Sequence, residues 1–288
     1  VIFERKWRFR TGDLESDWAL EVIPHVGFCL GNVNTQANAG LEVRADDPLG
    51  NLHRAAVFEQ RYQLAKLDQP IDRAEWEMTP QTVNAYHQPF MNEIVFPAGY
   101  LQPPNFNIDA DPAVNYGAIG YTIGHEIGHA FDDKGRAFDP YGKLNDWWTA
   151  EDAAHFEQAA AKLVEQYNAF SPLPGMSING KLTLGENIAD LTGITIAWRA
   201  YQASLDGREP PVIDGFTGAQ RFFIGFAQAE RAKMRDELLR SLLVSDPHSP
   251  SEFRVIGVLR NFTPFYEAFG VKEGDGMYLP PDQRVKIW

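Results

Sequence analysis

The chain has 288 residues, of which 44% are hydrophobic and 23% charged, as in an ordinary soluble globular protein with a substantial core. Its 26 basic and 39 acidic residues give a formal charge of −13. Such a charge argues against nucleic-acid binding, which needs a basic face, and against docking on anionic membranes. The single cysteine, Cys29, excludes an intrachain disulfide.

The sequence carries no run of about 18 apolar residues, so no membrane span is expected. Its first ten residues, VIFERKWRFR, lack the apolar core and small-residue cleavage site of a signal peptide. Because the chain begins with Val, we expect a fragment or a processed form. The sequence leaves three locations open: the bacterial periplasm, the outside of the cell after secretion, and the cytoplasm. It does not indicate an oligomeric state.

The first predicted elements lie in the N-terminal third of the chain. Residues 1–39 show no clear periodicity and are a candidate for a poorly ordered segment. Residues 51–66 predict a helix with a rough apolar stripe that includes Leu52 and Leu64. Residues 79–99 predict two short strands around a loop, formed by Val83, Ala85 and Tyr86 and by Ile94, Val95 and Phe96.

Helices dominate the rest of the prediction. Asp111 is a good N-cap and Pro112 is tolerated at the first helical position, so a long helix is expected from there to about residue 133. Further helices are expected from the Thr149 cap to about 170, over 184–204, over 215–240 after its first few residues, and near 263–269.

The long helix contains the sequence HEIGH at residues 125–129. Residues four apart lie on one face of a helix, so His125 and His129 can bind one metal ion without rearrangement of the backbone. Glu126 is next to the first ligand, where its carboxylate can reach a water on the metal and act as general base. This pattern is typical of zinc peptidases.

The competing interpretation is a helix with two solvated histidines. It is weakened by the flanking apolar residues, among them Ile119, Ile123 and Ile127, which predict a buried helix. Buried histidines and a buried glutamate need partners, because an unpaired polar group in the interior is costly.

A zinc site of this kind needs a third protein ligand and an open fourth position. The sequence GENIAD offers Glu186 as that ligand. Asp190, one turn later, can accept a hydrogen bond from the second nitrogen of a ligating histidine and so orient the ring. Alternatively, Thr183 and Glu186 match a capping box, in which the glutamate would only satisfy a helix end.

The chain resembles the neprilysin family of zinc metallopeptidases (gluzincins), a group that includes endothelin-converting enzyme and bacterial oligopeptidases. The resemblance extends from about Gly40 to Trp288. It is carried by LEVRADDPLGN, TPQTVNAY, NEIVFPAGYLQPP, NYGAIGYTIGHEIGHAFDD, NDWWT, GENIADLTG, DPHSPSEFRVIG and the terminal Trp. So many segments in one order make it specific.

The resemblance implies an α+β, mainly α, zincin-like (thermolysin-like) catalytic domain with a small edge β-sheet over residues 40–288. It implies one Zn²⁺ per chain and peptides as substrates. Asn84 and Ala85 would bind the substrate backbone on an edge strand, which suits the addition of an extended peptide to an exposed strand. His248 would stabilise the oxyanion, and Arg254 would contact the substrate and shape the pocket beyond the scissile bond.

Two departures from the family pattern stand out. Glu230 occupies a position that is commonly aromatic in the family and helps line the pocket after the scissile bond. The usual preference for bulky apolar side chains is therefore in doubt. In addition, residues 1–39 do not match the family's long N-terminal part, which forms a helical cap over the active site. We therefore expect a truncated or fragmentary member of the family.

The function expected from the sequence is that of a zinc endopeptidase, in which His125, His129 and Glu186 hold the metal and Glu126 activates water. One alternative is a truncated member that binds metal or peptide without turnover. A less favoured alternative is a non-haem iron enzyme, since two histidines and one carboxylate also bind Fe(II).

Overall fold

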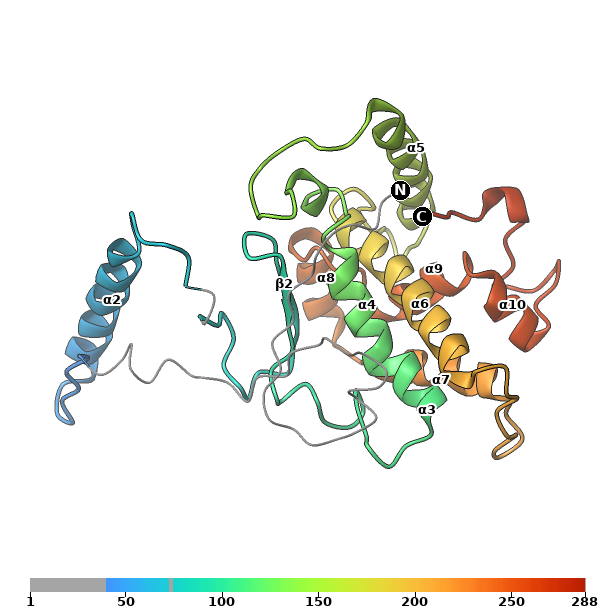
Figure 1. Ribbon diagram of the computed structural model, residues 1–288, viewed down its shortest axis with the longest axis horizontal. Coiled ribbons are helices and arrows are strands. Elements are labelled where there is room, and N and C mark those ends of the chain that lie inside the picture. Colours follow the sequence, from blue (N-terminus) through green and yellow to red (C-terminus); the bar gives the residue numbers. More distant parts are fainter. Residues whose placement is uncertain (1–39, 73–74, 288) are drawn as a thin grey trace.

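A computed structural model describes residues 40–72 and 75–287 of the chain (Figure 1). The expectation of poor order for residues 1–39, and the position of Cys29, lie outside these residues. Within them the prediction of a mainly helical domain with one small sheet is confirmed. None of the described helices is both long enough and apolar enough to cross a membrane.

Two helices lie side by side at the centre of the domain (Figure 1): α4, Tyr121–Gly128, and α6, Leu184–Leu205. Helix α5, Ala150–Asn168, and helix α9, Ser251–Leu259, pack against α6. Around them lie α3, Pro112–Asn115; α7, Gly218–Ala229; α8, Asp236–Ser245; α10, Thr263–Phe269; and the 3₁₀ turns Gly135–Ala137 and Pro281–Gln283.

Apolar side chains hold α4 and α6 in place from both sides. The larger buried cluster surrounds α6 and includes Ile188 and Ile194 of that helix, Leu163 of α5, Phe222 of α7 and Val258 of α9. A smaller cluster joins Ile123 of α4 and Ile119, just before that helix, to Ile94 of the sheet and to Ala85 and Phe96, which flank the strands. Helix α4 therefore lies between the sheet and the helical core, which explains why its residues are buried.

Glycines set the distance between α4 and α6. A Cβ atom on Gly124 would lie 2.7 Å from the carbonyl oxygen of Gly193, and one on Gly193 would lie 2.7 Å from the carbonyl oxygen of Tyr121. Atoms that close would clash, so only residues without a side chain permit this approach. The contact brings the first turn of α6 next to the end of α4, where HEIGH lies.

The predicted helix over 112–133 is divided and ends early. After α3, the segment Tyr116–Gly120 is a π-helix, which leads directly into α4. Helix α4 ends at Gly128, with His129 as its C-cap, because the chain then turns through residues 129–134 into the 3₁₀ turn at Gly135. His125 and His129 nevertheless remain one helical turn apart on the same face, as the spacing predicts.

The sheet has two antiparallel strands, β1, Tyr86–Gln88, and β2, Glu93–Val95, with Tyr86 opposite Val95. The prediction placed the first strand too early. Val83 is 69% exposed and lies outside it, and Asn84 and Ala85 directly precede it rather than form part of it. Apolar and β-branched residues favour a strand, but the start of pairing depends on the partner.

Helix α2, Pro48–Ala65, matches the helix predicted over 51–66, but its apolar stripe is not buried. None of its residues is buried, and Leu52 and Leu64 are 69% and 56% exposed. The helix lies away from the main body in Figure 1. The predicted helix is therefore present, and its apolar stripe packs against no core among the described residues.

The single helix predicted up to residue 240 is two helices. Helix α7 begins with a capping box between Thr217 and Gln220 and ends at Ala229, and α8 starts only at Asp236. Neither Gly nor Pro marks the break, so no local signal predicts it. The break has a consequence for the site, because Glu230 is the C-cap of α7.

Candidate metal centre and active site

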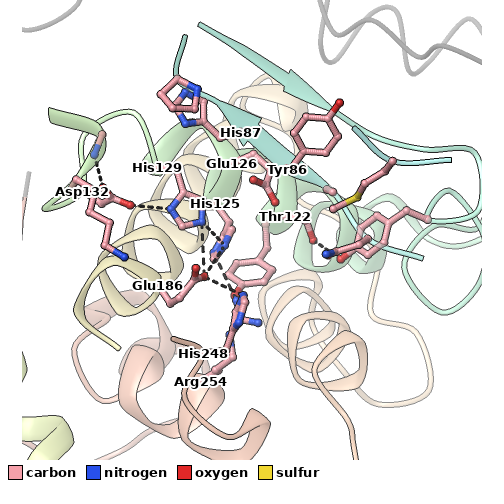
Figure 2. Close-up of a pocket in the computed structure, with 18 of the residues that line it drawn as sticks. Tyr86, His87, Thr122, His125, Glu126, His129, Asp132, Glu186, His248 and Arg254 are labelled. Atoms are coloured by element: carbon pink, nitrogen blue, oxygen red, sulfur yellow. Dashed lines mark hydrogen bonds and ion pairs between the residues drawn. The ribbon is translucent and has the colours of Figure 1, made fainter. Parts of the chain in front are cut away.

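Three side chains from α4 and α6 converge on one point, as Figure 2 shows. Nε2 of His125 lies 3.0 Å from Nε2 of His129. Oε2 of Glu186 lies 3.3 Å from the first of these nitrogens and 3.6 Å from the second. All three residues, which the sequence predicted as metal ligands, therefore present one donor atom each to a common centre.

The arrangement fits a tetrahedral zinc ion. Donors about 2.0–2.1 Å from a tetrahedral metal stand roughly 3.3 Å from one another, which matches the distances here. Oε2 of Glu186 is buried and faces Nε2 of His125, His129 and His248 at 3.2–3.6 Å, but none of these contacts has the geometry of a hydrogen bond. A buried carboxylate oxygen in that state calls for a cation, and two imidazoles with one carboxylate are a donor set that zinc prefers.

The capping alternative for Glu186 is wrong. Thr183 makes no side-chain capping hydrogen bond at the start of α6, and its hydroxyl instead donates to the carbonyl oxygen of Asn179. The histidines hold the pKa of Glu186 well below its usual range, even though burial alone would raise it. The first turn of α6 thus presents an ionised carboxylate to the centre.

Each histidine has a carboxylate behind its other ring nitrogen. Nδ1 of His125 lies 2.7 Å from Oδ1 of Asp190, as the sequence predicted. Nδ1 of His129 lies 2.7 Å from Oδ2 of Asp132, whose other oxygen accepts hydrogen bonds from the backbone N–H groups of residues 134 and 135. Such partners fix the ring so that Nε2 faces the metal.

Both imidazole rings are also more basic than buried histidines usually are. Burial alone would lower the pKa of His125, but the carboxylates of Asp190 and Glu186 outweigh it and raise the pKa to about 9. Burial alone would likewise lower the pKa of His129, but Asp132 and Glu186 outweigh this effect and raise the pKa well above its usual value. The same negative groups that attract a proton here would attract a metal cation.

Glu126 points into the same space from the adjacent position on α4 (Figure 2). Its side chain is buried, and burial raises the pKa of its carboxyl, with the nearby charge of Glu186 adding to the effect. A carboxylate that is poorly solvated and close to the metal ligands is suited to accept a proton.

A pocket of about 370 Å³ opens over this centre. Its walls include Asn84, Ala85 and Tyr86, at and just before the start of β1. Strand β1 pairs with β2 along one edge, so its backbone runs past the centre in an extended conformation. The two residues predicted to bind substrate backbone are therefore brought to the pocket.

His248 and Arg254 reach the centre from the C-terminal part of the chain (Figure 2). Nε2 of His248 lies 3.2 Å from Oε2 of Glu186, and its Nδ1 lies 2.8 Å from Oδ1 of Asp246. Arg254 is bound to Asp190 by two hydrogen bonds, Nε to Oδ2 at 2.9 Å and Nη2 to Oδ1 at 2.5 Å. Both side chains line the pocket.

A model of peptidase family M13 matches residues 84–285 of the chain. The chain belongs to this family. The resemblance seen in the sequence is thereby confirmed. A second model, that of the outer membrane protein LpxR, matches residues 1–94, which is too small a part of the chain to establish membership of that family.

Relatives in the family are similar over most of this chain. Neprilysin-3 of Drosophila melanogaster is 40% identical over 254 residues, which cover 87% of this chain and 32% of that protein. Human neprilysin is 39% identical over 281 residues, which cover 94% of this chain and 37% of that protein. The chain therefore spans about a third of the length of these relatives.

The fold agrees with solved structures of the family. The crystal structure of the Mycobacterium tuberculosis zinc metalloprotease Zmp1, in complex with an inhibitor, superposes with a TM-score of 0.84 at 52% identity. The match covers 86% of this chain and 39% of that chain. The zincin-like, mainly helical fold expected from the sequence is confirmed.

Sequence reasoning missed three polar residues of this M13 site. Asp132 lies three residues after His129, within the same motif, and its spacing could have identified it. Asp246 opens the DPHSP loop and orients His248. The hydroxyl of Tyr121 donates to Oδ1 of Asp190 at 2.5 Å, and no sequence signal distinguishes this tyrosine from an ordinary core residue.

Proposed function

We propose that this chain is the zinc-binding, peptide-cleaving part of a metalloendopeptidase. One observation carries the proposal: donor atoms of His125, His129 and Glu186 converge at tetrahedral spacing beside the buried carboxylate of Glu126. Membership of family M13 and the likeness to a zinc metalloprotease support zinc, one ion per chain, and peptides as substrates.

The metal would be held by His125, His129 and Glu186. When bound, zinc supplies a Lewis acid that lowers the pKa of water to about 7 and polarises a carbonyl oxygen. Asp190 and Asp132 keep the two imidazole rings in position through their Nδ1 atoms. A rigid ligand set leaves the fourth position for water and substrate.

Glu126 serves as the general base and then as the general acid. Its carboxylate takes a proton from the attacking water as the oxygen forms a bond to the scissile carbonyl carbon. It then delivers that proton to the leaving amine nitrogen as the peptide bond breaks. The raised pKa of this carboxyl favours the first step, because the conjugate base of a weaker acid accepts a proton more readily.

The remaining residues of the pocket bind and polarise the substrate. His248, oriented by Asp246, donates a hydrogen bond to the carbonyl oxygen as it gains negative charge. Asn84 and Ala85 align the substrate backbone along the start of β1. Arg254 faces the pocket with its Nη1 edge, while Asp190 holds the rest of its guanidinium.

The experiment that tests this function is cleavage of a mixed peptide library by the zinc-loaded chain. We expect endoproteolytic products, their loss on addition of chelator, and their return when zinc is added. Glu126→Gln should keep one zinc per chain and lower the rate by at least about 100-fold. A variant with the unmutated rate would remove Glu126 from the mechanism.

Metal analysis of the same samples separates the alternatives. Bound zinc without cleavage would favour a metal-binding chain that lacks turnover. Bound iron with oxygen consumption would favour a non-haem iron enzyme, although the ligands lie on helices α4 and α6.

A further inference from the structure

The end of helix α7 places an acidic side chain in the wall of the pocket. Helix α7 stops at Ala229, and Glu230 is its C-cap residue. The side chain of Glu230 is 13% exposed and lines the same pocket as His125, Glu126, His248 and Arg254. Its carboxylate therefore borders the space in which a substrate side chain next to the cleaved bond would lie.

This carboxylate forms only a long ion pair with its neighbour Arg254. Arg254 forms two hydrogen bonds with Asp190 and a third, 3.1 Å long, with the hydroxyl oxygen of Tyr121. Its Nη1 lies 3.8 Å from Oε2 of Glu230, which is too long for a hydrogen bond. The hydrogen bonds of Arg254 thus go to Asp190 and Tyr121, and Glu230 makes no side-chain hydrogen bond among the residues described.

Two further features favour a cation at this end of the pocket. The C-terminus of a helix carries a partial negative charge, and Glu230 lies at that end of the 12-residue helix α7. Burial, and after it the nearby charge of Asp190, also raises the pKa of the Glu230 carboxyl, although Arg254 opposes this shift. The nearby positive charge of Arg254 therefore does not fully offset the burial of this carboxylate, and an incoming cation would stabilise its charge further.

The neighbouring wall suits a long side chain with a charged end. Tyr100 and Thr122 line the pocket, and their hydroxyl oxygens lie 3.0 Å apart. The Tyr100 hydroxyl has its pKa raised to about 12, mainly by burial, and the charge of Glu230 is near enough to contribute. An aromatic face beside a carboxylate can hold the methylene stem of a lysine or arginine while its charged end pairs with the carboxylate.

We propose that Glu230 selects substrates with a lysine or arginine next to the peptide bond that is cleaved. This proposal rests on the proposed peptidase function, because it assigns a specificity to the same pocket. The alternative is that Glu230 only supports Arg254 within the protein. The two differ in one respect: only the first makes peptide selection depend on the charge at position 230.

The test compares peptides that differ only at the two residues flanking the cut, with Lys, Arg, Leu, Phe or Glu at each. We expect kcat/KM for the Lys and Arg peptides to exceed that for the Leu and Phe peptides by about tenfold or more at one flanking position. Glu230→Gln should reduce this ratio to about threefold or less, and Glu230→Trp should invert it. Glu165→Gln, which removes an exposed carboxylate on α5, should leave the ratio unchanged.

A binding measurement keeps this proposal separate from the proposed function. In a Glu126→Gln background, calorimetry with the same peptides reports affinity without turnover. Tighter binding of basic peptides that Glu230→Gln abolishes would support the selection even if the unmutated chain cleaved nothing. Equal affinities for Lys and Leu peptides, or a preference that Glu230→Gln leaves intact, would overturn it.

Discussion

Asp190 of α6 binds His125 and Arg254 at once. Its Oδ1 lies 2.7 Å from Nδ1 of His125 and 2.5 Å from Nη2 of Arg254, and its side chain is fully buried. Arg254 and the hydrogen bonds from both partners hold the pKa of this carboxyl well below its usual range, against the effect of burial. One ionised group therefore links a proposed metal ligand to the wall of the pocket.

Asp190→Asn tests this link. We expect zinc affinity to fall by about 10–100-fold, because His125 loses the acceptor that orients it and raises its basicity. The buried guanidinium of Arg254 also loses its counter-charge, which should lower the free energy of unfolding by about 3–5 kcal/mol. Competition with a fluorescent chelator and denaturant titration measure the two effects. Asp206→Asn, at an exposed position, is the control, and unchanged zinc affinity in Asp190→Asn would contradict the assignment.

Gly193→Ala tests whether close packing of α4 and α6 assembles the metal site. The added Cβ would lie 2.7 Å from the carbonyl oxygen of Tyr121 and 2.9 Å from the backbone nitrogen of His125. The helices must separate, so we expect weaker zinc binding and a loss of about 1–3 kcal/mol in stability. Gly276→Ala, which adds a methyl group where nothing lies within 4 Å, should change neither. Normal zinc affinity in Gly193→Ala would show that the site tolerates a shift of α6.

Glu186→Ala separates metal binding from helix capping. We expect the zinc content after dialysis to fall well below one per chain, while far-ultraviolet circular dichroism stays unchanged, since Thr183 and Glu186 form no capping box. The increase in melting temperature that zinc gives the unmutated chain should also be lost. Full zinc retention together with lower helicity would contradict the assignment of Glu186 as a ligand.

The metal centre was predictable from the sequence because helical geometry links spacing to position. Residues 125 and 129 had to share a helical face, and a later glutamate on a buried helix was the natural third ligand. The roles of Asn84, Ala85, His248 and Arg254 came only from the family resemblance. The structure brings all four to the pocket, and their functions stay predictions.

The features that the sequence did not predict depend on tertiary contacts. The Tyr116–Gly120 π-helix lies where a Cβ on Gly117 would come within 2.0 Å of the carbonyl oxygen of Phe222 in α7, a long-range contact that no local pattern encodes. The apolar stripe of α2 stays exposed, because burial requires a partner surface and none of the described residues provides one. The break after Ala229 likewise lacks a local signal, yet it is what turns Glu230 toward the pocket.

Glu230→Gln should stabilise the folded chain at neutral and alkaline pH. Burial, and after it Asp190, raises the pKa of the Glu230 carboxyl in the folded state, although Arg254 partly opposes this. The folded chain therefore binds this proton more tightly than the unfolded chain does, and stability is lost as pH rises through the folded-state pKa. Glutamine carries no such charge, so the variant should melt about 2–4 °C higher at pH 8, the shift that about 1 kcal/mol gives in a domain of this size.

The pH dependence of the melting-temperature gain in Glu230→Gln shows whether the charge of the Glu230 carboxylate causes it. With chelator present throughout, so that zinc loss in acid does not enter, the gain should shrink toward pH 4, where the carboxyl is protonated in the folded state. Glu165→Gln provides the matched control and should show no such trend, because its carboxylate is exposed. A lower melting temperature for Glu230→Gln at pH 8 would mean that Arg254 needs Glu230 as a partner. The carboxylate would then serve the stability of the fold, and the selection of basic substrates would lose its physical basis.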